Sequence, residues 1–565
     1  MTPIRRADPS YRLLCIALSI ALAPGVHAQT HITPPTSGQI LQETQPPNTP
    51  VPPSELKLKN LRPQRNRAAS SESFQVQRIE ITGNTRLPSA KLHALVAPEE
   101  GKNLTLGDLD DLADRITEAY RAHGYPLDMA YVPQQTLSNG VVHISVVEVR
   151  YGNVTLQNHS DVANHVLNAT LSPLQSGQPV SNYTLERSLL LLTDVPGAIV
   201  NSAVQPGAEV GTSDLIVDVT PAPRYTGTLG LDDYGNRYTD RVRLSGTFNV
   251  NGLFNQGDVL SLAGVSSGGG MNYGSAGYKY LLNGQGTVLG ASVTDLHYQL
   301  RNGLSDLHAH GTALVQSVNL LQPLIRNTAG NLYGQIEFDH KRLSDDIDIA
   351  DIQTIRHSNV WVGTLAGDQR DDTGVTNFNI SGSYGRLYFN NLYSEFVDAL
   401  GPRTAGSFTK FDYSVSRLQR FGQVDAVYVG VIGQKANKNL DTSEQFYLGG
   451  PNTVRGYDVG AISGAQGYMA TVEYRRDFIL SPLPGPWQAS VFVDSGRVQA
   501  YKKTFLLGTN SARLNSVGLG LHWVAMHDWV VSASVAKPIG NRPQLLGSNA
   551  SDAAHFWFQV QKGFY

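Results

Sequence analysis

The chain contains 565 residues, of which 16% are charged, and its formal net charge is −3 at pH 7. This balance provides no basic surface of the kind that nucleic acids require, so we expect no nucleic-acid partner. The single cysteine, Cys15, lies near the N-terminus, which excludes a disulfide framework and a thiolate metal site from the remainder of the chain.

Residues 1–28 are predicted to be a secretory signal peptide. Three arginines precede an apolar run at 13–23, and Val26 and Ala28 supply the small side chains of a cleavage site. The run is too short to cross a bilayer as a helix, which needs about 20 residues. The pattern therefore indicates export.

Residues 29–72 are predicted to be an extended linker, because this stretch is rich in proline and poor in aromatic side chains. Within it, residues 37–43 can form two helical turns, which is a marginal length for an isolated helix.

Two small α+β units are predicted next, at 73–149 and 150–223. Each follows the order β-α-α-β-β. In the first unit, a strand near Ile79 precedes a helix that Thr105 caps and Gly124 ends.

The second strand of each unit, 128–132 and 198–204, runs into a proline, Pro133 or Pro206. Because proline cannot donate to a strand ladder, the strand before Pro133 is expected at a sheet edge. The strand before Pro206 is expected at the edge of its own sheet for the same reason.

From residue 224 to 565, apolar side chains fall on every second position of short segments that Gly, Asn, Asp and Ser separate. In 516–523, for example, Val517 and Leu519 alternate with Ser516 and Gly518. Such alternation builds one apolar wall and one polar wall, as in an outer-membrane barrel. About 340 residues, at roughly 21 per strand and turn, predict sixteen antiparallel strands.

Two short motifs stand out in this region. The strand that carries the second motif should turn Val491 and Val493 toward lipid, so the side chains between them should face the lumen. The motifs are Val454, Arg455, Gly456 and Tyr457 in the long connection 436–467, and Phe492, Asp494 and Gly496 at the end of that strand.

These motifs resemble the VRGY loop and the F-x-D-x-G strand of the outer-membrane transporters of two-partner secretion, the haemolysin and filamentous-haemagglutinin secretion type. The stretch 131–148 resembles the P-x-Q-x-L-x-x-G-x-x-x-I-x-V-x-E ending of the first periplasmic POTRA domain of that family. The three motifs occur in the expected order, and the resemblance covers the whole mature chain.

The resemblance implies a mainly β protein of the Gram-negative outer membrane. A 16-stranded antiparallel transmembrane β-barrel (224–565) would follow two periplasmic α+β POTRA domains (73–149 and 150–223). The family also has a helix that plugs the barrel, usually longer than the stretch 37–43 found here.

The resemblance also places Arg455 beside Asp494, where charge-assisted hydrogen bonds would anchor the tip of a loop folded into the lumen. The alternative is that the two are separate solvated charges.

An exposed sheet edge can bind an unfolded client as an added strand, so the two edge strands are the candidate substrate-binding segments. The alternative is that the units only support barrel assembly. The candidate residues are Asp128, Met129, Ala130, Tyr131 and Val132 in the first unit, and Ile199, Val200 and Ala203 in the second.

We therefore expect a pore that captures a large secreted partner protein, through its N-terminal secretion domain, and moves it to the cell surface. Outer-membrane lipid and the barrel-assembly machinery are the other expected partners, and no catalytic residue, metal or cofactor is expected. An assembly or insertion factor of the same superfamily and a passive porin are the alternatives. The identity of the cargo stays open.

Overall fold

The computed structural model describes residues 34–44, 58–60, 72–136, 139–481, 483–549 and 552–565. The predicted signal peptide lies outside the described residues. None of the described helices is both long enough and apolar enough to span a membrane.

The C-terminal part forms a closed antiparallel barrel of sixteen strands, which confirms the predicted fold class. The barrel closes where the first and last strands pair, with Gly227 opposite Phe564. The strands are β10 Tyr225–Asp232, β11 Arg243–Asn251, β12 Val259–Ser266, β13 Met271–Leu281, β14 Val288–Gln299, β15 Ala309–Arg326, β16 Gly330–Ile347, β17 Ile352–Asp371, β18 Gly374–Phe389, β19 Gly406–Phe421, β20 Asp425–Ala436, β23 Gln466–Ile479, β24 Pro486–Gln499, β25 Ser511–Val524, β26 Trp529–Pro538 and β27 His555–Phe564.

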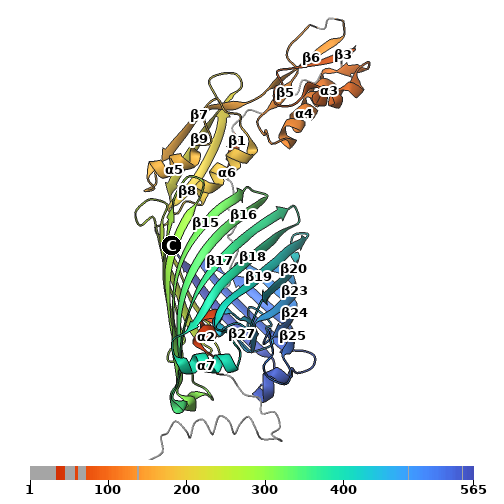
Figure 1. Cartoon of the computed structure of the whole chain (residues 1–565). Coiled ribbons are helices and arrows are strands. Elements are labelled where there is room, and N and C mark those ends of the chain that lie inside the picture. The colour runs from red at the N-terminus through yellow and green to blue at the C-terminus, as the bar shows by residue number, and fades with distance from the viewer. Residues whose placement is uncertain (1–33, 45–57, 61–71, 137–138, 482, 550–551) are drawn as a thin grey trace, which may run out of the picture.

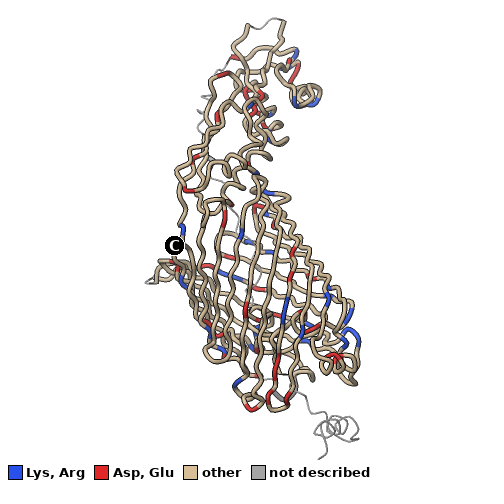
Figure 2. The backbone as a smooth tube through the Cα atoms, turned by 60° about the vertical axis from the view of Figure 1, so that its left-hand side comes forward, with Lys and Arg blue, Asp and Glu red and all other residues tan. Residues whose placement is uncertain are grey.

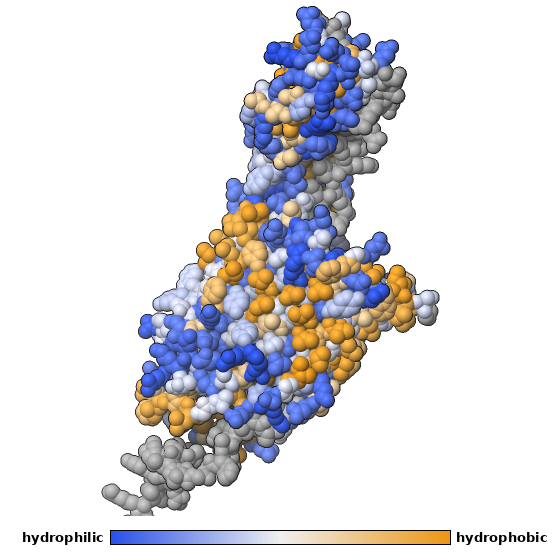
Figure 3. All heavy atoms as spheres, turned by 90° about the vertical axis from the view of Figure 1, so that its right-hand side faces the viewer, coloured by the Kyte–Doolittle hydropathy of each residue, from blue (hydrophilic) through white to orange (hydrophobic). Residues whose placement is uncertain are grey.

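Side chains alternate between the two faces of the barrel wall. In β24, Val491 and Val493 are about half exposed on the outside, at 50% and 48%, whereas Phe492 and Asp494 are buried inside. Figure 3 shows apolar side chains on the outer wall and mainly hydrophilic ones on the N-terminal units. Charged residues of both signs lie along the barrel and in the loops at the end far from those units (Figure 2).

The N-terminal units stack beyond one end of the barrel, here called the proximal end (Figure 1). In the first unit, strands β3 Arg78–Thr82, β6 Val141–Val147 and β5 Met129–Tyr131 form a sheet in that order, with β5 at the edge. Helices α3 Ser89–Val96 and α4 Leu106–Ala122 pack on it, and β2 Ser73–Gln75 pairs with β4 Asn103–Thr105.

Helix α4 begins at the predicted cap. The Thr105 hydroxyl accepts a hydrogen bond from the Asp108 backbone N–H, and the Asp108 carboxylate accepts one from the Thr105 N–H, which completes a capping box. The apolar face of the helix, including Leu109, Ile116 and Tyr120, then packs into the core of the first unit.

The second unit differs from the expectation at its sheet edge. Strands β7 Arg150–Asn158, β8 Ala198–Pro206 and β9 Thr212–Pro221 form a sheet with helices α5 Asn164–Leu171 and α6 Asn182–Thr193. A fourth strand from the linker, β1 Leu58–Asn60, lies parallel to β8 and covers part of its outer edge. The sequence did not predict this, because three residues carry no measurable periodicity.

A buried ion pair joins the second unit to the barrel. The guanidinium of Arg326, at the proximal end of β15, donates from Nε and Nη2 to the two carboxylate oxygens of Asp194, at 2.8 and 2.7 Å. Asp194 ends helix α6, and Arg326 is only 1% exposed. The contact therefore holds the second unit against the barrel rim.

Asp194→Ala should loosen this junction, because it removes two charge-assisted hydrogen bonds from a buried guanidinium, a loss of about 3–5 kcal/mol. Limited proteolysis in detergent should cut the connection near Ala222 faster than in the wild type. Glu186→Ala is the matched control: it lies on the same helix, and its exposed carboxylate binds only Thr328 across the junction. Equal cleavage rates for the two variants would contradict the role assigned to the buried pair.

Candidate functional site: a loop and a helix inside the barrel

The site lies in the lumen, near the end of the barrel far from the N-terminal units, here called the distal end. The long connection between β20 and β23 folds back into the lumen and contains a small hairpin, β21 Phe446–Leu448 and β22 Ile462–Gly464. Val454 and Tyr457 of the loop motif are buried against Leu448 of the hairpin and against side chains of the wall such as Met469 and Leu514. The tip of the loop therefore packs as part of the barrel interior.

Arg455 forms the expected ion pair with Asp494. Its Nε and Nη2 atoms donate to the two carboxylate oxygens of Asp494 at 3.0 and 2.8 Å, and its backbone N–H donates to the same carboxylate at 3.1 Å. The guanidinium also lies over the ring of Phe492, 3.1 Å from its centroid. Phe492 and Asp494 of the wall motif thus both hold the Arg455 side chain.

Further partners of this pair were not predicted. The second carboxylate is Glu473 on β23, which accepts from Arg455 Nη1 at 2.8 Å. The hydroxyls of Thr471 and Ser516 donate to Asp494, and Trp557 Nε1 donates to the Arg455 carbonyl. The alternation of β23, whose Val472 is exposed, is the signal that would have placed Glu473 and Thr471 inside.

The glycines of both motifs permit close approach. A Cβ on Gly456 would lie 2.7 Å from Ser516 Cβ and 2.9 Å from the backbone nitrogen of Pro538. A Cβ on Gly496 would lie 2.8 Å from Leu448 Cδ1. Because real side chains do not tolerate such distances, glycine at these positions lets the loop lie directly on the wall.

A second set of ion pairs anchors the base of the loop. Glu444, in the short helical turn Thr442–Glu444, accepts from the amino groups of Lys341 at 2.7 Å and Lys410 at 3.1 Å. These lysines project from β16 and β19, so the loop bridges separate parts of the wall. The sequence offered no signal for this contact, since the three residues are far apart in the chain.

Helix α2 Ser37–Thr44 lies inside the barrel near the distal end (Figure 1). Ile40 and Leu41 are buried against the wall, in a cluster that includes Leu296, Ala313 and Leu343. The helix thus occupies the lumen beside the inserted loop.

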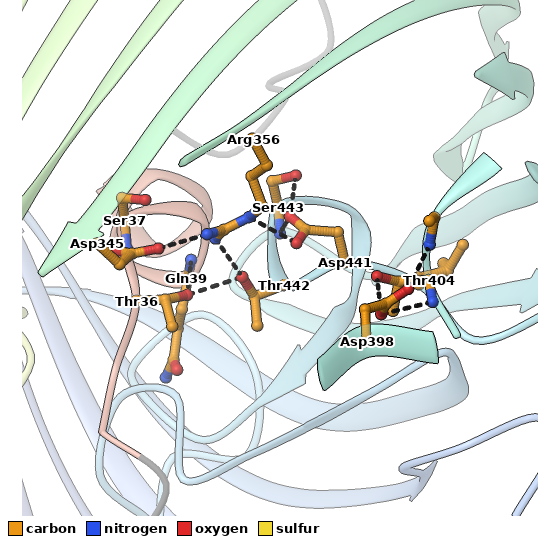
Figure 4. A network of polar contacts seen from close by, with 12 residues as sticks. Thr36, Ser37, Gln39, Asp345, Arg356, Asp398, Thr404, Asp441, Thr442 and Ser443 are labelled. Atoms are coloured by element: carbon orange, nitrogen blue, oxygen red, sulfur yellow. Dashed lines mark hydrogen bonds and ion pairs between the residues drawn. The ribbon is translucent and has the colours of Figure 1, made fainter. Parts of the chain in front are cut away.

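Polar contacts join this helix to the loop and to the wall. The Ser37 N–H donates to Asp345 on β16 at 2.6 Å, and the Thr36 hydroxyl donates to Thr442 at 2.7 Å (Figure 4). Gln42 donates to the Ser443 carbonyl at 2.6 Å. The helix is therefore attached at its first turn to both neighbours.

Arg356 of β17 lies where helix, loop and wall meet. Its Nη1 atom is 2.6 Å from Asp345, its Nε atom is 2.7 Å from Asp441 of the loop, and its Nη2 atom donates to Thr442 at 3.2 Å (Figure 4). Asp345 also accepts a hydrogen bond from the Ser37 N–H of the helix. The buried Arg356 guanidinium therefore connects the residue that holds the helix, Asp345, with the residues that it binds in the loop.

Glu43, in the last turn of α2, accepts hydrogen bonds from Gln39 at 2.7 Å and from Asn236 at 3.0 Å. Burial of the carboxylate raises the pKa of Glu43 to about 7, although these two hydrogen bonds and the charge of Arg243 act in the opposite direction. The docked helix thus favours the neutral form of this side chain.

The candidate edge in the first unit is largely occupied. Asp128 is buried and accepts from the Val149 N–H at 2.8 Å and from Arg86 at 2.5 Å. The Ala130 N–H donates to the Thr117 hydroxyl of α4 at 2.9 Å, so it is not available to a further strand. Of the other candidates, Met129 is exposed (36%), Tyr131 is half-buried and Val132 packs against the core.

In the second unit, the expectation of an open edge is corrected. Ala203 lies opposite Lys59 of β1, and β1 covers β8 from Ser202 to Val204. Ile199 and Val200 lie beyond the last residue that β1 covers, so this part of the edge has no strand partner on that side among the described residues. The outer side of β8 is therefore a sheet edge that β1, from the chain's own linker, covers in part.

Within the described part of the chain, no group of three or more His, Cys, Asp or Glu side chains is arranged to hold a metal ion.

Comparisons with known proteins agree with this geometry. Residues 211–522 match the family described as haemolysin secretion/activation protein ShlB/FhaC/HecB, and residues 74–148 match the ShlB-type POTRA domain. The chain is 28% identical over 501 residues to the heme/hemopexin transporter protein HuxB of Haemophilus influenzae, with 87% of each chain covered. It is 25% identical over 447 residues to the outer membrane transporter CdiB of Escherichia coli, with 77% of this chain and 74% of CdiB covered.

Solved structures share the fold. CdiB from Escherichia coli superposes with a TM-score of 0.68 at 21% identity, over 89% of this chain and 93% of CdiB. BamA from Haemophilus ducreyi, lacking POTRA domains 1–3, superposes with a TM-score of 0.52 at 15% identity, over 87% of this chain and 100% of BamA.

The family match covers more than half of the chain, and the loop and wall motifs meet in the lumen. The proximal end, with its POTRA domain, is therefore periplasmic, and the distal loops are extracellular. The chain belongs to the ShlB/FhaC/HecB family of haemolysin secretion/activation proteins and is an outer-membrane pore of two-partner secretion.

Proposed function

We propose that this pore captures a large exoprotein by strand addition at the β8 edge of the second unit, and passes it through the barrel once α2 leaves the lumen. The observation that carries the proposal is β1 on β8: a strand from the linker already occupies this edge, so the edge accepts extended chain. Ile199 and Val200, which have no strand partner on that side among the described residues, offer a place where a client strand can begin to pair.

The inserted loop is proposed to stay anchored through Arg455 and Asp494 while the helix moves. The loop has a bidentate ion pair at its tip and the Glu444 pairs at its base. Helix α2 has only eight residues and is held by the buried side chains of Ile40 and Leu41 and by single hydrogen bonds. The helix is therefore the weaker of the two obstructions in the lumen.

Outer-membrane lipid and the barrel-assembly machinery are the further partners that we propose. No catalytic role is assigned to any residue, since the family consists of secretion proteins.

The test of the secretion function compares the proteins on the cell surface and in the culture fluid of cells with and without this chain. Loss of one large exoprotein from both fractions, and its recovery when the chain is restored, is the expected result. Unchanged exoprotein combined with reduced levels of many outer-membrane barrels would instead favour an assembly factor.

The docking of α2 is expected to weaken as the pH rises. The docked helix holds Glu43 with a pKa of about 7, whereas a released helix in water has an ordinary carboxyl value near 4.5. Docking is therefore fully favoured below about 4.5 and loses stability as the pH rises through about 7. In planar bilayers, the open probability should increase over this interval.

Glu43→Gln should keep the channel closed across the same interval, because a neutral amide cannot be deprotonated. Glu395→Gln, which removes an exposed carboxylate outside the contacts of the helix, is the control for losing a titratable side chain without changing Glu43. If Glu43→Gln opens with the same pH profile as the wild type, Glu43 is not the titrating group.

A further inference from the structure

The outward face of β16, β17 and β18 carries a basic cluster just beyond its apolar band. The side chains of Trp361 (55%) and Tyr384 (57%) are exposed on this face. Every second residue of a strand points to the same side, so three successive rows of cross-strand partners lie on this face. From the apolar band toward the extracellular end, the rows are Phe338, Trp361 and Tyr384, then His340, Asn359 and Arg386, then Arg342, His357 and Tyr388.

The direction of the strands places the basic rows outside. β16 and β18 run toward extracellular loops and β17 runs away from one, so His340, Arg386 and their neighbours lie on the extracellular side of Trp361. Residues two apart on a strand are separated by about 6.7 Å, so both rows lie within about 14 Å of the aromatic side chains.

Each side chain of the cluster contacts the next one, so the contacts form a continuous chain across the three strands. Arg342 Nε lies 3.1 Å from His340 Nε2, and the rings of His340 and His357 are 6.2 Å apart. His357 stacks on Tyr388 at 4.9 Å, and the Arg386 guanidinium lies 5.1 Å from the same ring. Two guanidinium groups and two imidazoles from three strands thus form one continuous surface.

In the described part of the chain, no carboxylate acts as a counter-ion to the arginines of this surface. Among the residues that the structure describes, neither Arg342 nor Arg386 forms an ion pair with a carboxylate. Asp346, further along the outward face of β16, accepts instead from Ser344 at 3.1 Å. The inward arginines behave differently, since Arg356 and Arg455 each bind two carboxylates.

A second outward pair repeats the pattern elsewhere on the wall. Arg497 of β24 lies directly opposite Arg513 of β25, and both are exposed. The guanidinium of Arg497 donates to the Ser511 hydroxyl at 3.3 Å, and no carboxylate joins the pair in the described part of the chain. Like charges directly opposite each other in a sheet are destabilising unless an anion lies between them.

We propose that the outward cluster of Arg342, His340, His357 and Arg386 binds the phosphate of a phosphorylated lipid headgroup in the outer leaflet. Planar guanidinium groups match phosphate oxygens in paired, charge-assisted hydrogen bonds. Aromatic side chains mark the boundary of the apolar layer, so a basic surface immediately beyond them lies at headgroup level. The acyl chains would then run along the apolar band that includes Ile336 and Leu365.

A lipid source is favoured over a free anion, because the cluster is continuous with the lipid-facing wall and points away from the lumen through which cargo passes. The inference adds a lipid site to a secretion pore and does not depend on how the cargo is captured.

The test is a binding titration of the purified full-length protein in detergent, followed by native mass spectrometry. The probes are diphosphoryl lipid A, the same lipid without phosphates, and inorganic phosphate. The wild type should bind the diphosphoryl lipid more tightly than the phosphate-free lipid. The Arg342→Gln, Arg386→Gln double variant should lose at least about a hundredfold in affinity, because each of the two arginines removed takes away at least one hydrogen bond to a charged group, worth about tenfold or more.

Arg476→Gln is the matched control, because it removes an arginine from the outward face at the periplasmic end of β23, where Arg476 lies 3.7 Å from Asp425. Its affinity for the lipid should equal that of the wild type. The Arg342→Lys, Arg386→Lys variant, which keeps both charges, should bind more tightly than the glutamine variant.

Equal wild-type affinity for the two lipids, or an unchanged affinity in the glutamine variant, overturns the proposal. Displacement of the lipid by millimolar inorganic phosphate, with the same loss in the glutamine variant, would assign the site to free phosphate. Heat-modifiable migration on gels checks that each variant is folded, and Arg386→Gln alone repeats the test if the double variant fails to fold.

Discussion

Arg455→Ala is expected to abolish most secretion while leaving the barrel inserted. The substitution leaves Asp494 fully buried without its guanidinium, a loss of about 3–5 kcal/mol for a broken buried ion pair. The tip of the loop should then detach from the wall, whereas the lipid-facing side chains are unchanged. Exoprotein in the culture fluid and heat-modifiable migration of the barrel measure the two effects separately.

Asp494→Ala should also impair secretion, and the double variant should lose less than the sum of the two, because both changes remove the same interaction. Glu473 still binds the guanidinium in the single Asp494 variant, so its defect should be the smaller one. Arg417→Ala is the control, since its ion pair with Asp371 is exposed and contributes at most about 1 kcal/mol. Strictly additive defects would argue against a direct functional pair.

A disulfide that fixes β1 on β8 is expected to block secretion. Lys59→Cys and Ala203→Cys place cysteines at register partners on adjacent strands, which lie about 4.8 Å apart, within the roughly 4.4–6.8 Å that a disulfide spans. The only natural cysteine, Cys15, lies in the predicted signal peptide. With the edge permanently occupied, cargo binding to the oxidised protein should fall more than about tenfold, and a reductant should restore it.

The control places a disulfide between strands that are already neighbours in the first unit, through Met129→Cys and Val147→Cys. This crosslink should leave secretion unchanged in both redox states. Normal secretion by the oxidised β1–β8 protein, with the crosslink confirmed on a gel, would rule out the β8 edge as the capture site.

The strand alternation predicted the barrel and the inward direction of Phe492 and Asp494, and the length of the alternating region predicted its sixteen strands. This succeeded because a strand has a period of two, so the face of each side chain follows from its position. The cap at Thr105 was equally local, since a capping box spans only four residues, here Thr105 to Asp108.

The local sequence pattern was not sufficient to predict whether the two sheet edges are free to bind another strand. Pro133 indicated that β5 is an edge strand, but not that Thr117 of α4 already accepts the Ala130 N–H. Nothing near 198–204 indicated that Leu58–Asn60 would pair there. Whether an edge strand is already paired depends on segments that are distant from it in the chain. The local pattern of a single sequence does not show which of these segments contact the edge.

The sequence by itself determined the transmembrane barrel, the order of the domains and the two motifs, because each of these is written in short-range periodicity or spacing. Only the tertiary structure decided which charges meet. It places Glu473 with Arg455 and Arg356 between helix and loop, and it gives the outward arginines of β16 and β18 no carboxylate partner among the described residues. The physical reason is that barrel closure brings residues from separate strands within hydrogen-bond distance. The electrostatic free energy of a buried charge depends on these spatial neighbours and not on the residues next to it in the chain.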